Sequence, residues 1–168
     1  PSGRGRAAVV DWLSALKSFY GYANAMLIDS RREVLLSLVS GARLEAPWTA
    51  VVREAMRSSQ VSLTDLHPES GSGAIYAALI VPVVVSGRNP PIGAFVLWID
   101  PNTFLYPHLQ SWPTPSRTAE TLLVRREGDQ VLYLNELRHR KGTALRFSLP
   151  IEQRRGRLPA ADAVSGRQ

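Results

Sequence analysis

Residues 75–99 have the sequence IYAALIVPVVVSGRNPPIGAFVLWI, and this stretch decides the fold of the chain. Two apolar runs, Ile75–Val85 and Ile92–Ile99, are rich in β-branched residues and flank the Gly- and Pro-containing segment Ser86–Pro91. This pattern predicts a buried central β-hairpin. Because proline has no backbone N–H to give to a sheet, Pro82 predicts an edge position or a bulge in the first strand.

The residues before this hairpin predict a helix followed by another hairpin. A helix is expected over Ala7–Ala23, where apolar side chains recur at helical spacing. Two short apolar runs, Ala25–Ile28 and Val34–Val39, are joined by the polar segment Asp29–Glu33 and predict two antiparallel strands. The apolar stripe of the helix consists of Val9, Trp12, Leu13, Leu16, Phe19, Tyr20 and Ala23.

Between the two hairpins the sequence predicts a helix, a strand and a loop. Pro47 is expected at the first helical position, and the helix should end near Ser59. Val61–Leu66 is predicted as a strand, and His67–Gly73 as a loop because of its Pro, Gly and Ser content. Five strands with helices grouped on one side predict an antiparallel α+β module.

After the central hairpin, Asp100 and Pro101 predict the N-cap and first residue of a short helix that ends at Leu109. Ser111–Ser116 is expected to be a connector. Further strands are expected at Leu122–Val124, Val131–Leu134 and Ala144–Leu149, with a turn at Gly128-Asp129 and a polar helix or loop from Pro150.

Two long segments, 93–107 and 111–140, resemble the extracytoplasmic sensor regions of bacterial membrane-bound histidine kinases and diguanylate cyclases, of the double-Cache, PAS-like type. The resemblance is strong over 92–150 and weaker, but in order, over 7–85. It implies a stalk helix ending in residues 1–24, a membrane-distal PAS-like unit with a five-stranded antiparallel sheet at 25–112, and a truncated membrane-proximal unit at 113–168.

The resemblance also implies a function. The segment would be a noncatalytic sensor that binds a small solute and relays a signal across the inner membrane from the periplasmic side. A homodimer through the stalk helix and flanking transmembrane helices are expected in the parent receptor, whereas no cofactor is expected.

Composition limits the chemistry that is available to the 168 residues. The absence of Cys excludes disulfides, zinc–thiolate sites, iron–sulfur clusters and a cysteine nucleophile. Asp65, His67 and Ser70 lie close in sequence, but no Gly-x-Ser-x-Gly elbow accompanies them. His67, His108 and His139 have no paired metal-ligand spacing. No catalytic or metal-binding residue is therefore predicted, and an enzyme ranks last among the hypotheses.

The net charge of +6 favours an alternative function. Nine basic and eight acidic residues precede residue 113, whereas eleven basic and six acidic residues follow Trp112. The basic segment Arg138–Lys141 makes a nucleic-acid or anionic-surface binding module the alternative, with a steep salt dependence as its test. Only Tyr133 and Phe147 are aromatic after Trp112, which is unlike single-strand binders, so no nucleic-acid partner is expected.

Trp48, Arg53, Asp65, Tyr76 and Trp98 are the predicted ligand-binding residues. Trp48 and Arg53 lie on the helix expected to cover the sheet, Asp65 ends a strand, and Tyr76 and Trp98 lie on the central strands. A pocket for a small ligand needs an apolar wall with a few fixed polar groups, which these residues offer. The alternative is that Tyr76 and Trp98 are core residues only.

Overall fold

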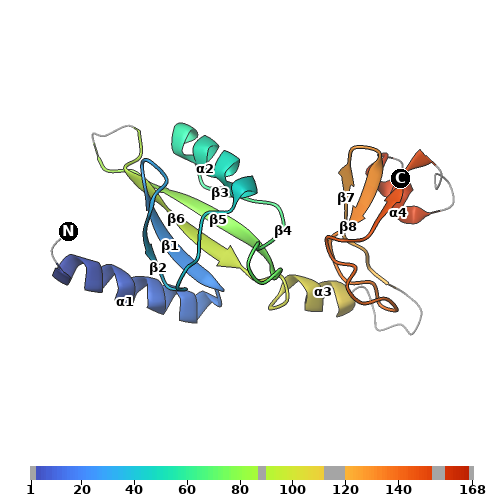
Figure 1. Cartoon of the computed structure of the whole chain (residues 1–168), viewed down its shortest axis with the longest axis horizontal. Helices are drawn as coiled ribbons and strands as arrows, with labels where there is room; N and C mark the ends of the chain where they lie inside the picture. The colour runs from blue at the N-terminus through green and yellow to red at the C-terminus, as the bar shows by residue number, and fades with distance from the viewer. Residues whose placement is uncertain (1–2, 87–89, 112–119, 153–157, 167–168) are drawn as a thin grey trace. The chain divides into compact units, whose positions relative to one another are not determined.

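The computed structural model of the chain describes residues 3–86, 90–111, 120–152 and 158–166 (Figure 1). Internal contacts divide the chain into unit 1, residues 1–101, and unit 2, residues 102–168. This division lies before the boundary at residue 112 that the sequence suggests. Both units combine helices with an antiparallel sheet, so the predicted α+β class is confirmed.

Unit 1 contains a six-stranded sheet with the order β2-β1-β6-β5-β3, and β4 pairs with β5. The predicted count of five was wrong because two residues of the expected loop, His67 and Pro68, pair with Tyr76 and Ile75. Pro68 has no backbone N–H to donate to the sheet. Because β4 is only two residues long, this interrupts no longer run of strand pairing. The strands are β1 (Asn24–Asp29), β2 (Val34–Ser37), β3 (Ser62–Leu63), β4 (His67–Pro68), β5 (Ile75–Val83) and β6 (Gly93–Ile99).

The predicted central hairpin is confirmed as β5 and β6, which pair from Ala77↔Ile99 to Val83↔Gly93 without a register shift. The structure also explains Pro82. Thr64 N–H donates to Ala78 O, so the even-numbered residues of β5 direct their backbone polar groups toward β3. The pairing with β3 extends only to Ile80, and Pro82 therefore occupies a local edge where no donor is needed.

The two helices of unit 1 cover opposite faces of the sheet (Figure 1). The prediction that helices group on one side was wrong, because alternate residues of β1, β5 and β6 are apolar on both faces. Helix α1 (Gly3–Tyr20) packs through Leu13 in a core that includes Val9, Leu16, Ala25, Leu36, Phe95 and Leu97. Helix α2 (Ala46–Ser58) packs in a core formed by Met26, Ile28, Trp48, Val52, Ala55, Ala78, Ile80, Ala94, Val96 and Trp98.

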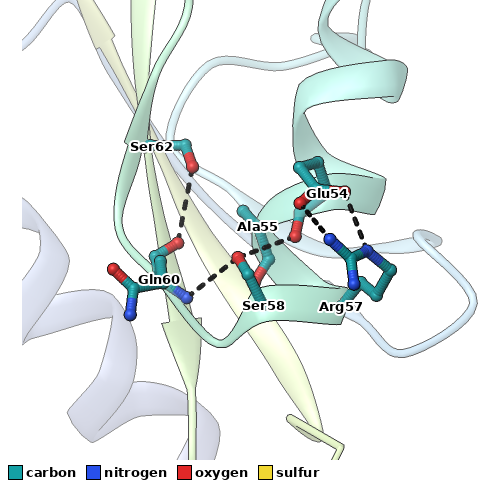
Figure 2. A network of polar contacts seen from close by, with 6 residues as sticks. All are labelled: Glu54, Ala55, Arg57, Ser58, Gln60 and Ser62. Carbon is teal, nitrogen blue, oxygen red and sulfur yellow. Dashed lines mark hydrogen bonds and ion pairs between the residues drawn. The ribbon is translucent and has the colours of Figure 1, made fainter.

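The C-terminal end of α2 is held by a chain of local polar contacts (Figure 2). The Ser58 hydroxyl donates to Glu54 O at 2.9 Å and accepts the N–H of Gln60 at 3.3 Å. Ser59 takes a left-handed conformation, with φ of 56°, that ends the helix. In the last turn of α2, Arg57 and Glu54 form an ion pair at 2.6 Å. These contacts fix the point at which α2 leads into β3.

Strand β3 is shorter than the predicted strand at Val61–Leu66. The Thr64 hydroxyl accepts the N–H of Ala78 at 2.7 Å, in the place of a backbone carbonyl. Regular pairing therefore stops at Leu63. Thr64 is buried, and its side chain serves the backbone of the sheet.

The short helix predicted from Asp100 starts later than expected, as α3 (Leu105–Ser111). Its first backbone bond joins His108 N–H to Phe104 O at 3.1 Å. Pro107 has no N–H to donate to Thr103 O, so a helix that began at Pro101 would lack this backbone bond. Pro101 and the next residues form turns, and Asp100 is not the N-cap of this helix.

Unit 2 contains α3, a three-stranded sheet with the order β7-β8-β9, and α4 (Pro159–Val164). The predicted hairpin is confirmed, as β7 (Val124–Glu127) and β8 (Gln130–Tyr133) turn at Gly128-Asp129. Strand β9 (Ser148–Pro150) occupies only the end of the predicted strand, because Ala144–Phe147 forms turns on Thr143 O. The predicted connector at 111–116 lies almost entirely outside the described residues.

The core of unit 2 includes the tail of the chain. Ala160 and Ala161 of α4 are buried, and Val131, Tyr133 and Ile151 lie in the same unit's core. The Tyr106 hydroxyl of α3 donates to Leu134 O at 2.6 Å. None of the described helices combines the length and apolar character that a membrane span requires.

A partly buried carboxylate contact holds the loop between β8 and β9. Thr143 donates to Glu136 Oε2 through its N–H at 2.9 Å and its hydroxyl at 3.0 Å. Burial alone would raise the pKa of Glu136, but these bonds, with those from Ala144 and Gly142 N–H, lower it below the usual range. The ionised form is therefore the one that stabilises the loop.

We expect Glu136→Gln to lower the free energy of unfolding at neutral pH and to have less effect in acid. A carboxyl with a lowered folded-state pKa adds stability above its ordinary pKa of about 4.3, and this stability is lost as the pH falls through the lowered value. Urea unfolding of both proteins between pH 7 and pH 3 measures the difference. A difference that stays constant over this range would contradict the role of the ionised carboxylate.

Candidate functional site

Three of the five predicted ligand-binding residues form one aromatic cluster between α2 and the sheet: Trp48, Tyr76 and Trp98. The ring centroids of Trp48 and Trp98 are 5.4 Å apart at an edge-on angle of 76°. Those of Tyr76 and Trp98 are 5.1 Å apart at 40°. Register explains the contact on the sheet, because Trp98 pairs with Ala78 and Tyr76 lies two residues before Ala78 on β5, on the same face.

The two tryptophans of the cluster are buried, with relative exposures of 1% for Trp48 and 5% for Trp98. Trp48 is in the first turn of α2, where Pro47 and the spacing of Trp48, Val52 and Ala55 direct this face of the helix to the sheet. Tyr76 is only partly buried. The cluster therefore extends from the core to the surface.

Both buried indoles carry an unsatisfied donor. Within the described part of the chain, neither Trp48 Nε1 nor Trp98 Nε1 has a hydrogen-bond partner. A buried tryptophan ordinarily finds an acceptor for its N–H, and leaving such a donor unpaired costs about 1–3 kcal/mol. An acceptor from outside the chain that reached either N–H group would stabilise it.

The surface end of the cluster is acidic. Tyr76 pairs with His67 of β4, and the register of β5 with β6 brings Asp100 beside it on the other side. Burial raises the pKa of the Tyr76 hydroxyl, and the negative charges of Asp100 and then Glu69 raise it further. Tyr76 thus lies in the field of two carboxylates.

Glu69 organises the loop between β4 and β5. Its carboxylate accepts the N–H of Ser72 at 2.6 Å, the Ser72 hydroxyl at 2.7 Å and the N–H of Gly71 at 2.8 Å. These bonds, led by that from Ser72 N–H, lower the pKa of Glu69 and keep it ionised. From the same loop, the Ser70 hydroxyl donates to Glu45 Oε2 at 2.8 Å, which ties the loop to the residue before α2.

The structure places the other two predicted residues, Arg53 and Asp65, outside the aromatic cluster, and both are exposed. Arg53 follows Val52, which faces the sheet, and is turned away by one helical step of about 100°. Asp65 Oδ1 accepts the N–H of Leu66 at 2.7 Å. Glu69 and Asp100 were not predicted as site residues. Asp100 carried a usable signal, because it lies two residues after Trp98 and thus on the same face of the strand.

The other sequence motifs form no comparable site. Among the described residues, no three His, Asp or Glu side chains lie together as a metal would require. Arg138, His139, Arg140 and Lys141 are exposed in the loop held by Glu136. The Arg140 guanidinium covers the Phe147 ring at 4.5 Å from its centroid. This contact occupies one of the two aromatic rings that follow Trp112.

No family model matches the sequence, and no curated protein matches it. Function is therefore inferred from the residues and contacts of the chain itself.

Proposed function

We propose that unit 1 is the ligand-binding part of an extracytoplasmic sensor domain of a membrane-bound histidine kinase or diguanylate cyclase. In this proposal a small solute binds at the aromatic cluster, and the segment itself is noncatalytic. The observation that carries the proposal is the pair of unpaired N–H donors on Trp48 and Trp98. The order of elements, two strands, a helix and further antiparallel strands, supports the PAS-like interpretation.

The chemistry of recognition follows from the two rings. A ligand that places an acceptor atom against the indole N–H groups satisfies donors that are otherwise desolvated and unpaired. Its apolar body would contact the ring surfaces, as in most small-molecule sites. Since both indoles are buried in this structure, entry requires movement of α2 or of the loop between β4 and β5.

Hydrogen bonds join both ends of α2 to neighbouring residues. The C-terminal end is fixed by Ser58 and Ser59 where the chain enters β3 (Figure 2). The N-terminal end, which carries Trp48, is joined to the β4–β5 loop by Ser70 and Glu45 at the surface. A ligand would shift the balance between closed and open positions only by its difference in affinity for them.

We propose in addition that α1 pairs with a second copy in the parent receptor, as part of a stalk helix. Trp12 and Phe19, which are two turns apart on α1, are 50% and 82% exposed. Exposed aromatic side chains at this spacing form one apolar stripe on a helix. The receptor would be anchored in the inner membrane by helices outside the present sequence, with this segment in the periplasm.

Thermal unfolding with a panel of amino acids, carboxylates, amines and alcohols tests the binding proposal. A ligand present at 100 times its Kd stabilises the folded state by about 2.7 kcal/mol, so at least one class should raise Tm by several degrees. We expect Trp48→Phe, which removes one donor, to reduce that shift. Trp12→Phe on α1 is the matched control and should leave the shift unchanged. No shift with any class would contradict ligand binding and favour a mechanical or protein-contact sensor.

A further inference from the structure

Helix α1 covers only part of its face of the sheet in unit 1. Among the described residues, the core beneath α1 contains side chains of β1, β2 and β6, whereas β5 adds Leu79 and β3 adds none. Leu63 of β3 pairs with Leu79, and directly opposed residues of paired strands lie on the same face. Leu63 is nevertheless 63% exposed. The part of this face that β3 and β5 form is therefore not covered by α1.

This uncovered part of the sheet is apolar. Val81 follows Leu79 by two residues on β5 and so lies on the same face, and both side chains are only partly buried. Val61, two residues before Leu63, is 60% exposed. Contiguous apolar surface of this kind marks sites of contact with another molecule. We call the surface of Leu63, Leu79 and Val81 the open face.

A stripe of exposed apolar side chains runs along α1 at intervals of four, three and four residues, which is the spacing of a helix that packs on a partner. The ring centroid of Trp12, in this stripe, lies 5.1 Å from that of Phe95, and Phe95 pairs with Val81. The stripe therefore borders the open face. The members of this α1 stripe are Ala8, Trp12, Ala15 and Phe19.

The two surfaces suit each other as well as they would suit a different partner. The chain carries both an exposed apolar helix stripe and an apolar sheet surface beside it. In a dimer with two-fold symmetry, each α1 stripe meets the open face of the other copy, so one operation covers both surfaces twice. Neither surface contains an ionisable side chain, so the contact desolvates no charge within it. These features favour a second copy of the chain as the occupant.

The size of the contact fits a weak dimer. Trp12 and Phe19 are 50% and 82% exposed. An aromatic side chain buries about 150–250 Å² when it is fully covered, so these two rings leave on the order of 250 Å² exposed in each copy. With the opposing open faces, two copies would bury roughly 1,000 Å² in total, near the lower limit for a specific interface. We therefore expect reversible association.

We propose that α1 of a second copy docks on the open face of unit 1, so that each α1 stripe contacts the sheet of the other copy as well as the other α1. This inference rests on the pairing of α1 proposed above and adds the sheet as the second half of the contact. Each α1 then lies between its own sheet and the partner copy.

Sedimentation equilibrium of the full chain over a range of concentrations tests the dimer. We expect Phe19→Ser and Leu63→Ser each to weaken dimerisation at least tenfold. Phe104→Ser and Val34→Ser change side chains that are 74% and 39% exposed elsewhere, and these matched controls should leave the dimer unchanged. Circular dichroism of each variant checks that the fold is kept. A folded Leu63→Ser chain that dimerises as the original does would overturn the proposal.

Cross-linking tests the same contact without removing Leu63. The chain has no cysteine, so Ala15→Cys on α1 and Val61→Cys beside β3 each introduce a single thiol. We expect a mixture of the two variants, treated with a short bismaleimide, to give an Ala15–Val61 link between chains that mass spectrometry identifies. Val34→Cys on β2 is the matched control for Val61→Cys and should give at least tenfold less product. Equal yields would contradict docking on the open face.

The outcomes separate this inference from the pairing on which it rests. If Phe19→Ser weakens the dimer and links form only between the two Ala15→Cys positions, α1 pairs with α1 but does not dock on the sheet, and the inference is wrong. If the chain stays monomeric up to its solubility limit, the inference and the α1 pairing both fall. The thermal-unfolding panel still tests ligand binding independently of either result.

Discussion

Trp98→Ala is expected to destabilise unit 1 by about 3–5 kcal/mol, which is much of the stability of an ordinary domain. Trp98 is 5% exposed and contacts both Trp48 and Tyr76, so its removal leaves a large cavity beneath α2. Urea or guanidinium unfolding measures the change in free energy. A loss below about 1 kcal/mol would contradict the buried position of this ring.

Trp98→Phe provides a sharper comparison, because it keeps an aromatic ring and removes the unpaired N–H. Removing a buried donor that has no acceptor recovers part of the energy lost with the smaller ring. We therefore expect a loss well below that of Trp98→Ala. Trp12→Ala is a control on α1, where the half-exposed ring contacts Phe95 at 5.1 Å, and its effect should also be smaller than that of Trp98→Ala.

Gly93→Ala is expected to be the second strongly destabilising substitution, by about 1–3 kcal/mol or more. A Cβ added at Gly93 would lie 2.3 Å from Ile28 O, a backbone atom of β1 that cannot turn aside. Gly93 pairs with Asp29, so relief of the clash would require β1 and β6 to separate at this end. Thermal and denaturant unfolding should both show the loss.

Gly3→Ala is the matched control for this substitution. Gly3 is the first residue of α1, its φ is not positive, and nothing lies within 4 Å of an added Cβ. Alanine there should be neutral or slightly stabilising, because it restricts the unfolded chain. Equal effects of the two substitutions would contradict the close approach of β1 to β6 at Gly93.

The central hairpin was predictable because its apolar runs are long and Gly and Pro separate them. The placement of the helices was not, since apolar residues alternate without a polar face on β6: Trp98 faces α2 whereas Leu97 faces α1. A sequence pattern that is apolar on both faces does not say which helix covers which face. Strand β4 was missed because two residues, His67 and Pro68, are too few to show a period.

The candidate site shows the same limit. The aromatic members were predictable, because large apolar side chains on a helix and on central strands meet in a core. Arg53 and Asp65 were predicted as site residues because of their charge, but the direction of each side chain depends on local structure that the sequence shows weakly. Arg53 is turned away from the sheet because it lies one helical step past Val52. Asp65 lies outside the strand because β3 ends at Leu63. The late start of α3 carried a signal in the sequence, since Pro107 lacks the N–H for a backbone bond to Thr103 O.

The alternation of residues along β6 has a mechanical consequence. Trp98 lies in the core under α2, and the adjacent residue, Leu97, lies in the core with Leu13 of α1. One peptide unit thus joins the two layers, so a shift of the strand at Trp98 also moves the surface on which α1 rests. Only the strand and its side chains therefore separate the aromatic cluster from α1 on the opposite face of the sheet.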